Sequence, residues 1–174
     1  MRLALTTIEG VEDVAAKEAG ELLRAAGIAD ADMEVRPDGV AGVTTVDAGR
    51  PAEESWAALA SMRSVEDVIA LGCTFTSTKD LTLPRIVAAV QEADLPALAD
   101  AESYRVTCER RGTHDFTSMD VERAGGAALG ARFGRRVDLE SPAVVVRVDV
   151  RQRQGLVGVL LNRGRLSMPS WRVY

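Results

Sequence analysis

Several residue types that build common functional sites are scarce in this 174-residue sequence. It contains one histidine and two cysteines, too few for a zinc site of the usual Cys/His type, so no metal centre is expected. The two thiols, Cys73 and Cys108, lie in apolar stretches and are predicted to be reduced and buried, as in a cytoplasmic protein. Aromatic residues make up only 4% of the chain, so its core must consist mainly of Val, Leu, Ala and Ile.

The sequence also lacks long apolar runs. No stretch approaches the roughly 18–20 apolar residues that cross a membrane. The first residues, MRLALTTIEGVED, turn acidic too early for a signal peptide. With 47% hydrophobic and 27% charged residues, the composition is that of an ordinary globular protein. We therefore expect a cytoplasmic protein without membrane contact.

Charge is distributed unevenly along the chain. Residues 1–102 contain 8 Lys/Arg and 19 Asp/Glu, a net charge of −11. Residues 103–174 contain 13 Lys/Arg and 7 Asp/Glu, a net charge of +6. Such an excess of cations in one part favours contact with a polyanion such as nucleic acid. The alternative is that charge drifts along the chain without a functional reason.

The first part of the chain predicts the order strand, helix, strand, strand, helix, strand. The predicted elements are a strand at 2–6, a helix at 10–26, strands at 33–36 and 40–47, a helix from Pro51 and a strand at 65–76. Val11, Val14, Ala15, Leu22 and Ala26 recur at helical spacing in the first helix. This order is typical of the ferredoxin-like fold, and the fold class is α+β.

The second part predicts a smaller α/β unit with its own sheet. The predicted elements are a helix at 81–93, a strand at 104–110, a helix from Thr117 or Ser118 to Phe133, and strands at 143–150 and 156–161. The glycine-rich stretch GGAALG lies inside the second of these helices, where small residues permit close packing.

The most specific stretch is CERRGTHDFTSMDVE, residues 108–122. Arg110 and Arg111 end a predicted strand, and Gly112 permits a sharp turn directly after them. His114 can donate a hydrogen bond to a phosphate or stack on a base. Two cations beside a turn indicate a site for an anionic partner.

A helix begins directly after this turn. Thr117 or Ser118 can cap it, and Asp120 completes a capping box with Thr117. The N–H groups and the dipole of a helix N-terminus favour an anion there. The alternative interpretation is a solvated turn before a capped helix, with Phe116 as a packing anchor.

These residues resemble the THUMP domain, an RNA-binding module of tRNA methyltransferases, thiouridine synthases and some pseudouridine synthases. The resemblance covers RVTCERRGTHDFTSMDVERAGGAAL, VDLESPAVVVRVDV and LVGVLLN. The opening TTIEGVEDVAAKE resembles the ferredoxin-like domain that precedes THUMP in guanine-N2 methyltransferases. The resemblance as a whole implies a ferredoxin-like domain at residues 1–79, a THUMP domain at 80–165, and a segment at 166–174 that leads to a catalytic domain in relatives.

The resemblance implies tRNA as the partner. The family signature falls on the stretch from Arg110 to Asp120, and arginines on the neighbouring strands and in the C-terminal segment extend it. The candidate RNA-binding residues are Arg105, Arg110, Arg111, Gly112, His114, Thr117, Ser118, Arg147, Arg165 and Arg172.

The sequence contains no recognisable catalytic motif. No G-x-G-x-x-G follows a strand, no Asn/Asp-Pro-Pro-aromatic motif of these methyltransferases occurs, and no nucleophile lies beside a base. We therefore expect no catalytic residue and no cofactor, and we expect that the chain as it stands is not an enzyme.

The leading hypothesis is a noncatalytic module that binds structured tRNA through phosphate and shape contacts and presents it to a separate modification enzyme such as a methyltransferase. The first alternative is the N-terminal RNA-binding part of an S-adenosylmethionine-dependent tRNA methyltransferase. The second is a ferredoxin-like ligand-sensing or assembly module without an RNA role, which the acidic first part of the chain favours.

Overall fold

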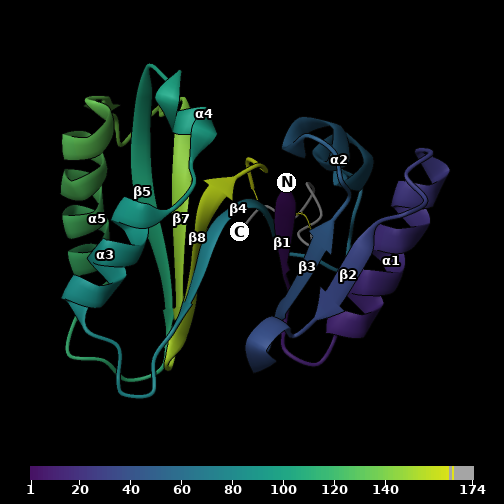
Figure 1. The fold of residues 1–174 in the computed structure, drawn as a ribbon, viewed down its shortest axis with the longest axis horizontal. Helices are drawn as coiled ribbons and strands as arrows, with labels where there is room; N and C mark the ends of the chain where they lie inside the picture. The colour runs from purple at the N-terminus through teal and green to yellow at the C-terminus, as the bar shows by residue number, and fades with distance from the viewer. Residues whose placement is uncertain (165, 167–174) are drawn as a thin grey trace, which may run out of the picture. The chain divides into compact units, whose positions relative to one another are not determined.

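The computed structural model describes residues 1–164 and 166. Contacts between residues divide the chain into two compact units (Figure 1). The first unit consists of Met1–Ala70 and Leu161–Tyr174, and the second of Leu71–Leu160. The second unit is therefore inserted into the first along the chain. The domain boundaries expected at residues 79 and 165 stay a prediction.

The first unit has the predicted ferredoxin-like order. Its elements are β1 (Arg2–Thr6), α1 (Glu12–Ala25), β2 (Asp32–Val35), the short 3-10 helix η1 (Pro37–Gly39), β3 (Val43–Asp47), α2 (Ala52–Leu59) and the beginning of β4 (Asp67–Thr76). The strands are ordered β2–β3–β1–β4, and β1 is antiparallel to both of its neighbours. The α+β class and the ferredoxin-like fold of this unit are confirmed.

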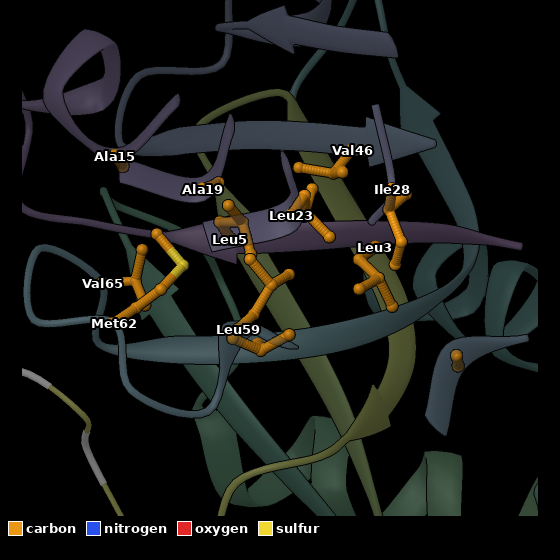
Figure 2. Close-up of a cluster of buried hydrophobic side chains, with 12 residues drawn as sticks. Leu3, Leu5, Ala15, Ala19, Leu23, Ile28, Val46, Leu59, Met62 and Val65 are labelled. Carbon is orange, nitrogen blue, oxygen red and sulfur yellow. The ribbon is translucent and has the colours of Figure 1, made fainter. Parts of the chain in front are cut away.

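The core of the first unit lies between this sheet and its two helices. Figure 2 shows Leu3 and Leu5 of β1 pointing toward Ala19 and Leu23 of α1, and all four are fully buried. Burying one Leu side chain stabilises a fold by roughly 1.5–3 kcal/mol, so aliphatic residues suffice where aromatics are scarce. Val14, which the helical spacing assigned to the apolar face of α1, is instead 52% exposed. That assignment was wrong because small alanines form the face that packs on the sheet.

The carboxylate of Glu12, the first residue of α1, is buried against two loops of the first unit. It accepts hydrogen bonds from the N–H of Gly10 at 2.9 Å and of Gly42 at 2.6 Å. The Arg36 guanidinium donates to it at 3.0 Å. The bond from Arg36 is the largest reason why the pKa of Glu12 is lowered to about 2, and it outweighs the burial that acts in the opposite direction.

The second unit consists of one sheet and helices that pack on it. Its elements are the end of β4, α3 (Leu83–Glu92), α4 (Pro96–Ala99), β5 (Ser103–Arg111), α5 (Ser118–Phe133), β6 (Arg136–Val137), β7 (Val144–Arg151) and β8 (Gln154–Leu160). The strands are ordered β4–β8–β7–β5–β6. β5 is parallel to β6 and β7, whereas β7 and β8 are antiparallel. α4 and β6 were not predicted, because four and two residues are too short to show a period.

Helices α3 and α5 lie together on one side of this sheet (Figure 1). Gly125, in the middle of α5, is buried, and a Cβ at this position would lie 3.7 Å from side-chain carbons of Val90 and Val106. The glycine-rich stretch thus lies inside a helix, as predicted, at the place where α3 and β5 approach it. Among the residues that the structure describes, no helix has the length and apolar character needed to cross a membrane.

Candidate RNA-binding site

Three connections of the second unit meet at one end of its sheet. Since β5 and β7 are parallel and Arg111 pairs with Arg151, the loop 112–117 after β5 lies beside the turn 152–153 after β7. The Ser77 N–H donates to the Arg153 carbonyl at 2.8 Å, which brings the loop 77–82 to the same place. Figure 1 shows these connections together where β5 and β7 end. We call residues 77–82, 112–117 and 152–153 the three-loop end.

Charge is separated between the two ends of the second unit. The unit as a whole is neutral, with 12 Lys/Arg and 12 Asp/Glu. At and beside the three-loop end, segments 76–85, 110–120 and 150–154 carry six cations and three acids. At the opposite end, segments 92–102 and 132–143 carry three cations and six acids. Within this unit, the segments at the three-loop end therefore carry a net charge of +3 and those at the opposite end a net charge of −3.

The turn after β5 has the backbone that the sequence predicted. Gly112 has φ +106, in the region that favours glycine. A Cβ added there would lie 3.0 Å from the amide nitrogen of the Gln152 side chain, so the loop and the turn approach closely. The backbone N–H of Gln152 donates to the Arg111 carbonyl at 3.1 Å and links the turn to the end of β5.

The N-terminus of α5 faces the same loop. Thr117 is the N-cap, and the capping box with Asp120 is complete. The Thr117 N–H donates to the Asp120 carboxylate at 2.8 Å, and this bond is the largest reason why the pKa of Asp120 is lowered. The predicted helix start and capping box are thus confirmed, and the positive end of the helix dipole lies at the three-loop end.

Phe116 and Ser118 anchor this helix start from the inside. Phe116 is 7% exposed, as expected of a packing anchor. The Ser118 side chain hydrogen-bonds the Cys108 thiol, whose pKa is raised to about 11 because it is buried. Both cysteines are free, as predicted, but they are only partly buried, contrary to the prediction of buried thiols. The raised pKa of Cys108 disfavours the reactive thiolate. Ser118 therefore serves the packing of α5 on β5.

Arg110 and His114 form a chain of contacts across the loop. Nη1 of Arg110 donates to the Gly112 carbonyl at 2.9 Å and lies 3.3 Å from Nδ1 of His114. Nε2 of His114 lies 2.8 Å from the Gln152 carbonyl oxygen. The imidazole also packs beside the Phe116 ring, with 5.0 Å between the ring centroids. The loop is therefore held in shape by side chains that the sequence assigned to RNA contact.

The structure does not bring Arg105 to this end. Arg105 pairs with Val145, six residues before Arg111, which places it roughly 20 Å away along the strand. Its guanidinium donates to the Leu139 carbonyl at 3.1 Å near the start of the sheet. One compact contact cannot include both Arg105 and Arg111.

Arg147 is buried in a group of ion pairs. Its Nη2 lies 2.6 Å from a Glu109 carboxylate oxygen and its Nε lies 2.7 Å from Oδ1 of Asp149. Only 9% of its side chain is exposed, so binding a phosphate would first require breaking a buried ion pair. Its position supports a role in holding β5 to β7. The remaining candidates, Arg165 and Arg172, lie outside the described residues.

The three-loop end also contains polar residues that the sequence analysis did not single out. They are Lys79, Gln152 and Arg153, and Arg85 of α3 lies beside them, where its guanidinium donates to the Thr76 carbonyl at 2.7 Å. Arg153 pairs with Asp80 at 3.3 Å, but both side chains are largely exposed, so the pair is weak and open to competition. The strands predicted at 143–150 and 156–161 leave residues 151–155, RQRQG, as the connection between them. Nothing local indicated that it lies beside residues 112–117, because that depends on the parallel pairing of β5 and β7.

Comparison with known proteins identifies the family of the second unit. Residues 81–160 match the model of the THUMP domain. A tRNA (guanine(6)-N2)-methyltransferase from Thermus thermophilus is 50% identical over 72 residues, 41% of this chain and 22% of the relative. A tRNA sulfurtransferase from Thermoplasma volcanium is 38% identical over 68 residues, 39% of this chain and 14% of the relative. The crystal structure of TrmN from Thermus thermophilus is 31% identical, covers 95% of this chain and 47% of that chain, and superimposes with a TM-score of 0.69.

The second unit therefore carries a THUMP domain, at residues 81–160. The relatives of the chain are tRNA methyltransferases and tRNA sulfurtransferases. The chain spans about half the length of TrmN and less than a quarter of each curated relative named above. The resemblance predicted from RRGTHDFTS and its flanking strands is confirmed.

These comparisons overturn the expectation that the chain is not an enzyme. The relatives are enzymes of tRNA modification, and the similarity to TrmN extends over 95% of the chain. The expectation depended on motifs that these 174 residues lack. The chain matches only part of each relative. The lack of those motifs in these residues therefore does not decide whether the protein is an enzyme.

Proposed function

We propose that this chain supplies the tRNA-binding part of a tRNA methyltransferase, and that the three-loop end of its THUMP unit contacts tRNA phosphates. The observation that carries the proposal is the excess of cations at this end of a unit that is neutral as a whole. The curated methyltransferase relative supports the enzyme class. A cytoplasmic location follows from tRNA as the substrate, and no separate partner enzyme is required.

Electrostatics favours this end over the first 70 residues of the chain. The segment 1–70 carries 6 Lys/Arg and 14 Asp/Glu, so it repels a polyanion. The candidate contacts are Lys79, Arg111 and Arg153, beside the N-terminus of α5. Cations near a helix N-terminus suit RNA phosphates, and a duplex stem is recognised largely through its backbone and shape. Arg110 and His114 support this surface from within the loop.

The proposal predicts that tRNA affinity depends on salt and on the charge at this end. Arg153→Ala should weaken tRNA binding and reduce the slope of log K against log salt by about 0.7–0.9, the effect of one lost phosphate contact. The measurement is a titration of unmodified tRNA at several salt concentrations.

Arg136→Ala is the matched control for this titration. Arg136 belongs to the same unit, pairs with Asp138 at 3.1 Å and has a largely exposed side chain, but it lies at the opposite end of the sheet. Its replacement should leave both affinity and slope nearly unchanged. Equal losses of affinity in the two variants would show that tRNA binding depends on the total charge of the unit. The proposal that the three-loop end contacts tRNA would then be refuted.

A further inference from the structure

The two ring nitrogens of His114 face partners of opposite kind. Nδ1 lies 3.3 Å from Nη1 of Arg110, and a guanidinium nitrogen can only donate. Nε2 lies 2.8 Å from the Gln152 carbonyl oxygen, which can only accept. Both contacts are hydrogen bonds only if Nδ1 accepts and Nε2 carries the proton. The geometry therefore selects the neutral Nε2–H tautomer.

This tautomer connects two segments that are 38 residues apart. On one side, Nδ1 of His114 contacts Nη1 of Arg110. The same Nη1 also donates to the Gly112 carbonyl at 2.9 Å. On the other side, it fixes the Gln152 carbonyl in the turn after β7. The buried Phe116 ring packs against the imidazole. His114 is thus built into the loop through both nitrogens and one ring face.

We propose that His114 is a positioning residue: its neutral Nε2–H form holds Arg110 and joins the loop 112–117 to the turn 152–153, and it does not itself bind RNA. The inference rests on the proposed function, because the loop it shapes is the candidate tRNA contact. It replaces the expectation that His114 donates to a phosphate or stacks on a base. Donation to a phosphate would require Nε2 to give up the Gln152 carbonyl, its contact with the neighbouring turn.

The first experiment is 15N NMR of the full chain with labelled histidine and without RNA. Because the chain has one histidine, its imidazole gives a single set of signals and needs no assignment. We expect a protonated Nε2, an unprotonated Nδ1 and a slowly exchanging Nε2 proton at neutral pH. An Nδ1–H tautomer or an imidazolium in the folded chain would overturn the inference.

The second experiment is a double-mutant cycle on tRNA affinity with His114→Ala, Arg110→Ala and the double variant. If His114 acts through Arg110, the double variant binds no more weakly than Arg110→Ala alone. The loss from His114→Ala should be roughly two- to twelvefold, the range for one hydrogen bond. His114→Asn, whose carbonyl can replace the accepting Nδ1, should recover part of it. Additive losses would show that His114 does not act through Arg110 and would overturn the proposal.

Arg136→Ala is again the control, since Arg136 pairs with Ser103 at the opposite end of the sheet and its replacement should leave affinity nearly unchanged. Thermal melts of all variants separate loss of fold from loss of contact. If the wild-type chain binds no tRNA, the proposed function fails and this inference fails with it. If the wild type binds and only the cycle is additive, the proposed function stands and the positioning role alone is refuted.

Discussion

The buried carboxylate of Glu12 joins the start of α1 to two loops of the first unit. Its side chain is 2% exposed and accepts two backbone hydrogen bonds and one from Arg36. Glu12 is also the first residue of α1, where a negative charge interacts favourably with the helix dipole. Its partners lie in loops that the sequence could not place beside it, since Gly42 is 30 residues away.

This site predicts a specific dependence of stability on pH. The pKa of Glu12 is lowered to about 2, below its usual 4.5, so its contribution is present above pH 4.5 and is lost as the pH falls toward 2. A difference of this size corresponds to about 3 kcal/mol in the free energy of unfolding. Glu12→Gln should lose about this amount at pH 7 and should show a flatter pH dependence between 4.5 and 2 in denaturant titrations.

Glu54→Gln provides the comparison, because Glu54 forms an exposed pair with Arg50 at 3.4 Å. Its replacement should change the free energy of unfolding by less than about 0.5 kcal/mol. A Glu12→Gln variant as stable as wild type would show that the buried carboxylate is not held by these partners.

At the scale of elements, the loop before α5 depends on an anchor that faces away from the candidate RNA surface. Phe116 is buried and packs beside His114, whereas Met119, on the first turn of the same helix, is 66% exposed. The two apolar residues therefore have different environments within one helical turn. Local sequence predicted Phe116 correctly because a large ring after a polar turn has few other roles.

Phe116→Ala should destabilise the protein by roughly 3–5 kcal/mol, because it removes a buried ring and leaves a cavity. The measurement is thermal or denaturant unfolding together with a tRNA titration. Binding should be lost only under conditions where the fold is lost. Met119→Ala should change stability by less than about 0.5 kcal/mol. A folded Phe116→Ala chain that no longer binds tRNA would assign the ring to RNA contact.

At the scale of the whole molecule, the chain leaves the first unit at residue 70 and returns to it at residue 161. Asn162, which is 4% exposed, marks this return. Its Oδ1 accepts from the Val68 N–H at 2.8 Å, and its Nδ2 donates to the Asp67 carboxylate at 2.9 Å and to the Gly164 carbonyl at 2.7 Å. One amide side chain thus ties the returning segment to β4.

Asn162→Ala should lower the free energy of unfolding by about 1–3 kcal/mol, because it removes the acceptor from a buried N–H group. Hydrogen exchange followed by mass spectrometry should localise faster exchange to residues 67–69 and leave β7 protected. Asn162→Asp is a sharper probe, since it keeps the acceptor and places a second carboxylate beside Asp67. Unchanged exchange in both variants would show that Asn162 does not hold the returning segment on β4.

The sequence by itself determined the features that depend on residues close together in the chain. The capping box joins Thr117 to Asp120, three residues apart, and the turn at Gly112 needs only the conformational freedom of one glycine. The order of strands and helices followed from local periodicity in the same way. Motif resemblance then identified the THUMP domain, because its signature is also a short contiguous stretch.

Only the tertiary structure decided which candidate residues meet. Arg147 and Arg111 are both arginines on strands, but register places one in buried ion pairs with Glu109 and Asp149 and the other at the end of β5. Gln152 reaches His114 because parallel β5 and β7 end at one edge of the sheet. Such contacts join residues about 40 positions apart, and their free energy depends on the packing of the whole unit. No local pattern carries that information, so the site became visible only in the folded chain.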